Sequence, residues 1–418
     1  MAARAVVVGA GIVGLMAAYH LRRQGLDVTV IDRADPGMGC SSGNAGFICP
    51  SLSAPLPAPG LIGRSLRSML SRESPLYIAP SALPLLSGWL FTFWRRCNAA
   101  DNEAGLAAML ALNRRTIELY DSLAEDGVAF EMHRRGLLFC FLDARALQAE
   151  YEELRRIARY DYAPPELRAK GELAAEEPAL SDAVVGAVAL PRERHVEPVS
   201  LAKGVAERLR SLGVEIVPRT TVLGFERNQG SVRAVLTTEG RVAVDLVAIA
   251  AGALSGRLTG ELGVRLPLQA GKGYSVTYPG LDAGIRHALY LGETKTVVSQ
   301  YDGALRVAGT MEFSGLNQRL SPARVRGLRA AARRYLRDPL PEEGQAWVGR
   351  RPMLPDGLPA IGRLPGLENA FVSTGHATNG VFMAPASGLA LAQLSVRGAA
   401  DVDLAPFDPG RFQGRQRS

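Results

Sequence analysis

The sequence predicts an α/β fold in which a Rossmann-like domain, assembled from separate parts of the chain, accompanies a second domain built on a mixed or antiparallel sheet. Three observations support this prediction. Residues 5–32 follow the order strand, glycine-rich turn, helix and strand. Two later stretches, 191–262 and 349–400, again contain helices and buried strands. Between them, residues 266–309 contain alternating apolar and polar positions, which are typical of antiparallel strands.

The glycine-rich turn follows an apolar strand, Ala5–Val8, and has the spacing G-x-G-x-x-G. In this fingerprint the first glycine permits a tight turn, the second lets the backbone approach a pyrophosphate, and the third allows close packing of helix on strand. Asp32 ends the second strand, where a carboxylate accepts both ribose hydroxyls and disfavours a 2′-phosphate. The stretch predicts a site for FAD or NAD formed by Gly9, Gly11, Ile12, Val13, Gly14, Asp32 and Arg33.

The composition and the net charge limit the kinds of partner that we expect for this chain. The chain has 418 residues and a net charge of +7, which suits an anionic substrate, a membrane surface or nucleic acid. No basic run is interleaved with aromatic residues, so we discount nucleic acid. The cysteines and histidines show neither a C-x-x-C pair nor metal-site spacing, which predicts a reduced, cytoplasmic protein without a metal. The fingerprint begins at the fifth residue, so we expect no signal peptide.

A loop rich in glycine, serine and asparagine, residues 37–46, follows the second strand almost directly. It lies where FAD requires backbone donors along its pyrophosphate and ribityl chain, although a plain surface loop is the alternative. On the first interpretation the cofactor is FAD and its contacts include Ser41, Ser42, Gly43, Asn44, Ala45 and Gly46.

These motifs, together with the proline-rich stretch 54–60, resemble the D-amino acid dehydrogenases. That family belongs to the FAD-dependent D-amino acid oxidase superfamily, with glycine oxidase and sarcosine oxidase as relatives, and the resemblance covers most of the chain. It implies non-covalently bound FAD and hydride transfer from the α-carbon of a D-amino acid to flavin N5. The resemblance implies an imino acid or its 2-oxo acid as product, and it leaves open a cyclic substrate such as D-proline or a hydroxyproline.

The resemblance also implies site residues in the later stretches. Arg351, in a Gly-x-Arg-Pro segment, matches the superfamily arginine that binds the substrate carboxylate. A guanidinium gives a planar, bidentate match to that group, and a structural ion pair is the alternative. His376 either lines the pocket or is satisfied by the backbone. Further cofactor contacts are expected from Val222, Ala251, Gly252, Gly349, Gly375, Thr378, Asn379 and Gly380.

Two tyrosines lie on the alternating strands that the family places over the flavin. Tyr274, in a Lys-Gly-Tyr-Ser segment, and Tyr290 can each present a phenol to the substrate, and packing within a half-buried strand is the alternative. The candidate catalytic residues are therefore Arg351, Tyr274 and Tyr290, and the candidate substrate contacts are Arg351, Tyr274 and His376. The arginine-rich helix expected over 321–336 is interpreted as a solvated face.

Two stretches concern membrane contact. Residues 61–72 alternate apolar residues with arginines, and residues 83–94 form an apolar run that precedes Arg95 and Arg96. The run is too short, and too interrupted by Pro84 and Gly88, to cross a bilayer. A helix packed on the second domain and a monotopic contact both fit it. A contact at the inner face of the membrane suits a dehydrogenase that passes electrons to a quinone or an electron-transfer protein.

The predicted domains are discontinuous. Residues 1–50, 191–262 and 349–400 form the FAD-binding domain, residues 51–190 and 263–348 form the substrate domain, and residues 401–418 form a C-terminal tail that is solvated from Arg411 onward. Two other functions stay open at this point: a glycine- or sarcosine-type amine oxidase that uses oxygen, and a non-catalytic flavoprotein subunit of an electron-transfer complex. Thr378 stands where glycine oxidase-like members have an arginine, which disfavours a glycine oxidase.

Overall fold

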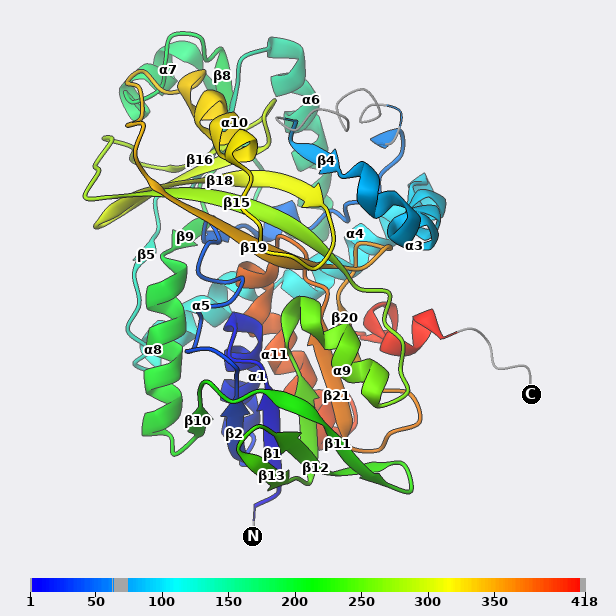
Figure 1. The fold of residues 1–418 in the computed structure, drawn as a ribbon. Coiled ribbons are helices and arrows are strands. Elements are labelled where there is room, and N and C mark those ends of the chain that lie inside the picture. Colours follow the sequence, from blue (N-terminus) through cyan, green and yellow to red (C-terminus); the bar gives the residue numbers. More distant parts are fainter. Residues whose placement is uncertain (1, 62, 64–73, 414–418) are drawn as a thin grey trace.

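The computed structural model describes residues 2–61, 63 and 74–413. Most of the arginine-containing stretch 61–72 lies outside the described residues. Two sheets dominate the chain, a six-stranded sheet in the lower half of Figure 1 and a nine-stranded sheet in the upper half. The predicted α/β architecture with a second, mixed sheet is confirmed.

The six-stranded sheet draws its strands from the beginning, the middle and the end of the chain. In spatial order they are β10 (Glu215–Val217), β2 (Asp27–Ile31), β1 (Arg4–Val8), β14 (Leu246–Ile249), β21 (Ala370–Thr374) and β20 (Ala360–Arg363). The pairs are parallel except at one edge, where β20 runs antiparallel to β21. Both faces of the sheet are covered, which is why β1 and β14 consist almost entirely of buried apolar residues.

Different elements cover the two faces of this sheet. One face packs against the helices α1 (Ile12–Arg23), α8 (Pro198–Ser211) and α11 (Gly380–Arg397). Helix α11 approaches α1 closely because Gly388 has no side chain, and a Cβ there would lie 2.7 Å from the Met16 backbone. The other face packs against α9 (Ser255–Glu261) and a three-stranded sheet of β11 (Val222–Asn228), β12 (Ser231–Thr237) and β13 (Gly240–Ala243).

The nine-stranded sheet lies above the six-stranded one and carries α10 (Pro322–Arg333) on its outer face (Figure 1). A small sheet of β3 (Phe47–Ile48), β9 (Arg194–Val196) and β5 (Met132–His133) lies between the two halves. The strand order of the large sheet is β19 (Gln345–Met353), β15 (Gln269–Pro279), β18 (Ala304–Phe313), β17 (Thr296–Tyr301), β16 (Ala288–Leu291), β6 (Leu137–Phe141), β8 (Gly186–Leu190) and β7 (Glu166–Ala169), with β4 (Leu76–Ile78) paired to β18.

Three segments differ from the sequence-based division. Helices α4 (Ala99–Asn113) and α5 (Thr116–Glu125) were expected in the substrate domain, but they contribute to the core around α1 and α11. Residues 349–353 belong to β19 and therefore to the nine-stranded sheet. The C-terminal tail is packed against the protein over residues 405–412, because Phe407 is fully buried and the Arg411 guanidinium, expected in solvent, donates to Asp356 at 2.7 Å.

The expectation of a solvated face on α10 is wrong at one position. Arg324 is 1% exposed, although it belongs to an arginine-rich helix. Its guanidinium donates to the carbonyl oxygens of Ser74 at 2.5 Å and Met311 at 3.0 Å. Arg324 therefore ties α10 to the junction of β4 and β18, a role that the local sequence pattern does not reveal.

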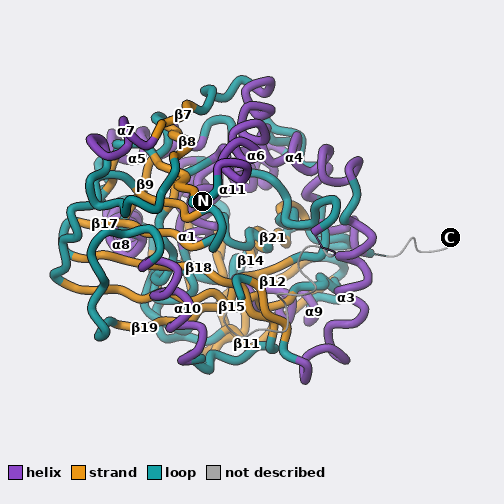
Figure 2. The backbone as a smooth tube through the Cα atoms, turned by 90° about the horizontal axis from the view of Figure 1, so that it is seen from above, coloured by secondary structure: helices purple, strands orange, loops and turns teal. Residues whose placement is uncertain are grey.

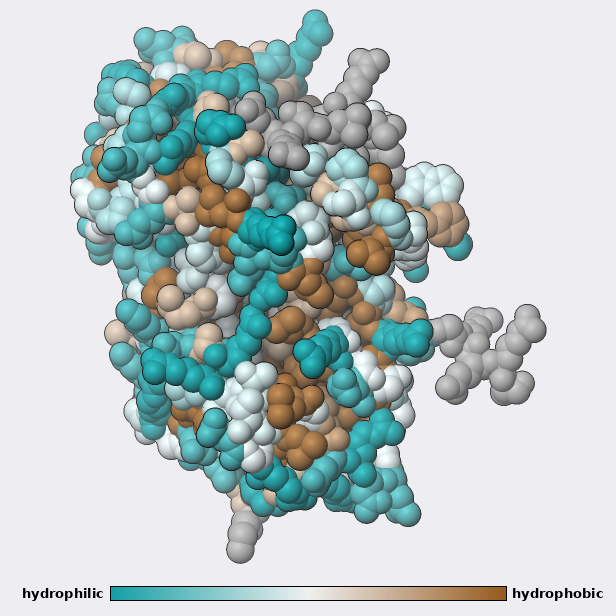
Figure 3. Space-filling view, viewed as in Figure 1, coloured by the Kyte–Doolittle hydropathy of each residue, from teal (hydrophilic) through white to brown (hydrophobic). Residues whose placement is uncertain are grey.

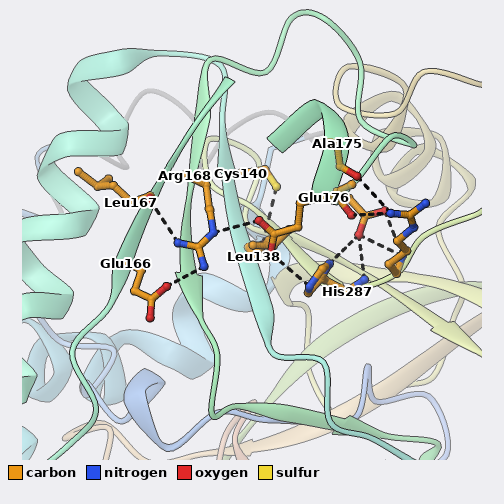
Figure 4. A network of polar contacts seen from close by, with 10 residues as sticks. Leu138, Cys140, Glu166, Leu167, Arg168, Ala175, Glu176 and His287 are labelled. Carbon is orange, nitrogen blue, oxygen red and sulfur yellow. Dashed lines mark hydrogen bonds and ion pairs between the residues drawn. The ribbon is translucent and has the colours of Figure 1, made fainter. Parts of the chain in front are cut away.

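A network of polar contacts lies at the β7 edge of the nine-stranded sheet, beside α6 (Ala144–Arg155) and α7 (Lys170–Glu176). Figure 4 shows Arg168 between Glu166 and Glu176, with donor–acceptor distances of 2.6 and 2.9 Å. His287 lies on the other side of Glu176, with Nε2 3.5 Å from its carboxylate. The network fixes α7 on the edge strand β7, and none of these residues lines the cavity described below.

Helix α3 (Leu83–Arg96) forms from the predicted apolar run and lies at the periphery of the molecule in Figures 1 and 2. Trp89 and Phe93 point into the protein, whereas Leu85, Phe91 and Trp94 are 82%, 57% and 57% exposed. Figure 3 shows apolar surface at this helix beside hydrophilic surface. No helix among the described residues is both long and apolar enough to cross a membrane.

Candidate active site

A cavity of 1470 Å³ extends between the six-stranded and nine-stranded sheets. The fingerprint glycines and Asp32 line one end, and Arg351 lines the part beneath the nine-stranded sheet. Most of the predicted site residues meet in this one space although they come from distant parts of the chain. Those in its lining are Gly9, Gly11, Ile12, Val13, Asp32, Arg33, Ser41, Gly43, Asn44, Ala45, Val222, Ala251, Gly252, Tyr290, Arg351, His376, Thr378, Asn379 and Gly380.

The fingerprint end has the geometry that FAD requires. Gly9 has φ +116°, and a Cβ there would lie 2.5 Å from the Ala250 carbonyl oxygen. A Cβ on Gly14 would lie 1.8 Å from the Gly9 carbonyl oxygen, so only glycine lets α1 start this close to the strand. Gly11 is the N-cap of α1 and has no side chain to cover the helix end, so the positive end of the helix faces the cavity. These residues fit a dinucleotide pyrophosphate.

Asp32 stabilises the fingerprint turn as well as facing the cavity. Its carboxylate accepts the N–H of Ala10 at 2.7 Å and the N–H of Ala34 at 2.8 Å. Each carboxylate oxygen has a further lone pair, so these bonds are compatible with ribose hydroxyls as additional donors. Thr220, Thr221 and Val222 also line the cavity.

The glycine- and serine-rich loop is held in place by the nine-stranded sheet. Arg306 on β18 donates to the carbonyl oxygens of Ser42 at 2.9 Å and Asn44 at 2.7 Å. The hydroxyls of Ser299 and Tyr301 on β17 both donate to the Ala45 carbonyl oxygen at 2.8 Å. These bonds hold the carbonyls of the loop toward the sheet, so the loop reaches the cavity in a fixed conformation.

Trp347, on β19, packs its indole ring against this loop at Gly43. A Cβ on Gly43 would lie 2.1 Å from the indole, and a Cβ on Gly349 would lie 1.8 Å from it. Both glycines are small because the ring of Trp347 needs the room. Trp347 lines the cavity, whereas Gly349, a predicted cofactor contact, does not.

Arg351 projects from the same face of β19 as Trp347, because residues two or four apart in a strand point to the same side. Its guanidinium lies over Gly273 on β15, where a Cβ would be 2.1 Å from Cζ. Nη1 donates to the carbonyl oxygen of Thr310 at 2.5 Å. Burial lowers the pKa of this guanidinium below its usual value, yet an arginine stays charged at neutral pH. Among the described residues no carboxylate forms an ion pair with it.

The Thr310 carbonyl, which accepts the hydrogen bond from Arg351, belongs to an irregular part of β18. Lys272 pairs with Glu312 and Tyr274 pairs with Gly309, so two residues of β18, Thr310 and Met311, face one residue of β15. This is a β-bulge, a feature that redirects side chains and carbonyls beside active sites. Thr310 has φ 59°, which is unfavourable for a β-branched residue and costs about 1–3 kcal/mol.

A buried charge network supports the bulge from behind. The Glu312 carboxylate accepts Lys272 Nζ at 2.8 Å, the Tyr274 hydroxyl at 2.6 Å and the Ser314 hydroxyl at 2.6 Å. Burial by itself raises the pKa of Glu312, but these donors outweigh it and hold the pKa below its usual value. Tyr274 is 1% exposed and absent from the cavity lining, so we leave it out of the proposed substrate contacts.

Two further candidate residues, Tyr290 and His376, line the cavity. Tyr290 packs against Phe139 with ring centroids 4.7 Å apart, and burial raises the pKa of its hydroxyl. His376 lies next to the N-terminus of α11, and its Nε2 is 3.0 Å from the Ser387 hydroxyl. Burial lowers the pKa of His376 to about 3, so its imidazole is neutral at physiological pH.

Four further predicted contacts have structural roles outside the cavity lining. Gly14 packs on Gly9, and the Ser42 hydroxyl donates to the Gly39 carbonyl oxygen at 3.0 Å. A Cβ on Gly46, at φ +74°, would meet the Val196 carbonyl oxygen at 1.8 Å. A Cβ on Gly375, at φ +84°, would meet Leu354 at 2.5 Å. The glycines are thus required by chain packing, whatever the cofactor contacts.

Comparison with known proteins agrees with this geometry. Residues 4–394 match the family model DAO, described as FAD dependent oxidoreductase. The chain belongs to this family of FAD-dependent oxidoreductases. It is 32% identical to a D-amino acid dehydrogenase of Chromohalobacter salexigens over 97% of this chain and 99% of the relative. A D-amino acid dehydrogenase of Bradyrhizobium diazoefficiens is 30% identical over 99% of both chains.

Solved structures show the same fold. Glycine oxidase from Geobacillus kaustophilus superposes with a TM-score of 0.77 at 24% identity, over 99% of this chain and 100% of that one. L-proline dehydrogenase from P. horikoshii superposes with a TM-score of 0.74 at 20% identity, over 98% of both chains. The protein is therefore an FAD-dependent oxidoreductase, and the cavity between its sheets has the place and the donors for FAD.

The flat contact between Arg351 and Gly273 gives a direct test of the site. We expect Gly273→Ala to keep the fold, because the clash falls on the end of a flexible side chain, and to displace the guanidinium. Loss of its charged hydrogen bonds is worth about 1.5–3 kcal/mol, or roughly a 10- to 100-fold weaker binding of a small carboxylate such as propionate. Perturbation of the flavin absorbance on titration measures this binding.

Gly303→Ala is the matched control, because a Cβ at this position, in the turn between β17 and β18, meets nothing within 4 Å. It is expected to bind propionate as the wild type does. Equal binding by wild type, Gly273→Ala and Gly303→Ala would show that Arg351 does not hold the carboxylate.

Proposed function

We propose that this protein is a D-amino acid dehydrogenase whose substrate carboxylate is bound by Arg351. The observation that carries the proposal is a half-buried, cationic guanidinium that faces the cavity without a carboxylate partner among the described residues. A charge partly withdrawn from water without a counterion is costly, so this site favours an anionic ligand. The names of the curated relatives support an amino acid as that ligand.

The arrangement of Arg351 suits one end of an amino acid. Nη1 is bound by the Thr310 carbonyl, which leaves Nε and Nη2 as a pair of parallel donors for a carboxylate. Bidentate binding fixes the carboxylate plane and hence the direction of the α-carbon. FAD, when bound in the adjoining part of the cavity, supplies the acceptor for a hydride from that carbon.

The N-terminus of α11 provides electrostatic support at the same place. Thr378, Asn379 and Gly380 line the cavity, and none of the described side chains caps this helix end. A helix N-terminus stabilises negative charge that develops nearby during the reaction. His376 is neutral and bonded to Ser387, so it is poorly placed to act as a general base. We propose that the substrate amine reacts in its neutral form.

The electron acceptor in this proposal is a quinone or an electron-transfer protein, reached at the inner face of the membrane. The exposed side chains Leu85, Phe91 and Trp94 on α3, followed by Arg95 and Arg96, support a peripheral contact with an anionic bilayer.

Co-sedimentation with vesicles that contain anionic lipid tests this membrane contact. We expect binding by the wild type and loss of binding by the double variant Phe91→Glu/Trp94→Glu, and equal sedimentation of the two would contradict it.

Anaerobic titration of the holoenzyme tests the activity itself. D-amino acids, with D-proline among them, are expected to bleach the flavin band near ~450 nm, while L-amino acids leave it unchanged. Arg351→Met is expected to lower kcat/KM by about 100- to 1000-fold, because the substrate carboxylate loses its charged partner. Arg351→Lys is expected to retain more activity than Arg351→Met, since it keeps the charge but not the planar fork.

The outcomes separate the alternatives. Bleaching by glycine or sarcosine alone, with rapid re-oxidation in air, would assign an amine oxidase. A flavin that none of these compounds reduces would assign a non-catalytic electron-transfer subunit. Re-oxidation by a soluble quinone analogue but not by air supports the dehydrogenase.

A further inference from the structure

The cavity continues past Arg351 into a pocket that the reaction itself does not require. Met311, beside Thr310 on β18, has its sulfur 4.0 Å from Arg351 Nη1. Beyond it, apolar side chains from β4, β18 and α3 line the cavity. We call this part the apolar chamber; its residues are Ile78, Trp89, Leu90, Phe93, Met311 and Phe313.

The apolar chamber has a fixed shape. The ring centroids of Trp89 and Phe313 are 5.2 Å apart, and those of Trp89 and Phe93 are 5.3 Å apart in a stacked arrangement. Met311, Phe313 and Ile78 are held by the pairing of β4 with β18. The strands and α3 therefore form walls of the chamber with side chains that support one another.

The position of the chamber relative to Arg351 determines what it holds. In a carboxylate bound by Arg351 the α-carbon lies two covalent bonds beyond the oxygens that accept from the guanidinium, and the Met311 sulfur is already next to that guanidinium. The apolar chamber begins at Met311, so a substituent of this carbon that points away from the fingerprint end can enter it.

Besides Arg351, the cations in the lining are Arg33, Arg257, Lys295 and Arg350, and none of them belongs to the apolar chamber. Lys295 lies in the turn between β16 and β17, where its Nζ is 3.9 Å from Glu150 and 5.4 Å from the ring of Tyr290. Arg350 lies close enough to Arg33, near the fingerprint end, for that second charge to lower its pKa further than burial alone does. Neither cation belongs to the apolar chamber.

We propose that the preferred substrates are D-amino acids with large apolar side chains, such as D-leucine, D-methionine and D-phenylalanine. This inference rests on the proposed function and specifies its substrate class. Each buried methylene group improves transfer from water by a factor of about four, so a chamber of this kind discriminates strongly against small and charged side chains.

Steady-state kinetics with a soluble quinone analogue test the proposal. The wild type is expected to show at least about tenfold higher kcat/KM for D-leucine and D-phenylalanine than for D-serine and D-aspartate. Equal or reversed values would overturn it. If no D-amino acid reduces the flavin at all, the proposed function has failed, which is a different result.

The substitution Leu90→Arg tests whether the substrate side chain binds in the apolar chamber. Leu90 is half-buried on α3, so an arginine there can extend along the chamber wall and still fold. We expect kcat/KM for D-phenylalanine to fall at least about tenfold, mainly through KM, and the ratio of D-glutamate to D-phenylalanine to rise. Ser87→Arg, at an exposed position of the same helix, is the matched control and is expected to leave both values unchanged.

Two results of this comparison would contradict the proposal. Equal effects of Leu90→Arg and Ser87→Arg on the amino acid values would show that the chamber does not hold the side chain. A change confined to the KM of the quinone analogue would show that the chamber receives the electron acceptor instead.

Discussion

The charge of Arg351 beneath the nine-stranded sheet is the constraint on which the site depends. A guanidinium taken out of water must be stabilised by neighbouring groups or by a ligand. The chain supplies a carbonyl oxygen, from Thr310, and a flat surface, from Gly273, but no carboxylate among the described residues. We propose that an anion supplies the rest of the interaction, which would make this structural position a binding site.

The carbonyl of Thr310 is in turn placed by residues outside the cavity. The bulge in β18 leaves Thr310 in a left-handed conformation, which a strand adopts only when its surroundings impose it. Glu312, one residue beyond the bulge, is fixed by Lys272 and Tyr274, and Arg324 donates to the Met311 carbonyl. The buried network thus maintains an unfavourable backbone conformation at the position where it orients Arg351.

The sequence was sufficient for the fold and for the fingerprint end because those features are local. Gly9, Gly11, Gly14 and Asp32 lie within one strand–helix–strand unit, and their spacing carries the geometry directly. The substrate end was predicted only in part. Arg351 was identified by resemblance and lies in the cavity, whereas Tyr274, from an equally good motif, bonds to Glu312 behind the sheet.

The missed residues depend on contacts between distant parts of the chain. Arg306 holds Ser42 from 264 residues away, and Arg324 holds Ser74 from 250 residues away. A bulge leaves no mark on the pattern of β18, so the special role of Thr310 was not visible either. Trp347 had a weak signal: it alternates with Gly349 and Arg351, which places all three on one face of an extended strand.

A crystal structure of the holoenzyme with 2-aminoisobutyrate, an amino acid that has no α-hydrogen and cannot be oxidised, tests the central claim most directly. The account predicts the carboxylate on Nε and Nη2 of Arg351 while Nη1 still donates to the Thr310 carbonyl. A carboxylate bound to Arg350 or Lys295, or an Arg351 turned away from the ligand into an ion pair, would contradict it.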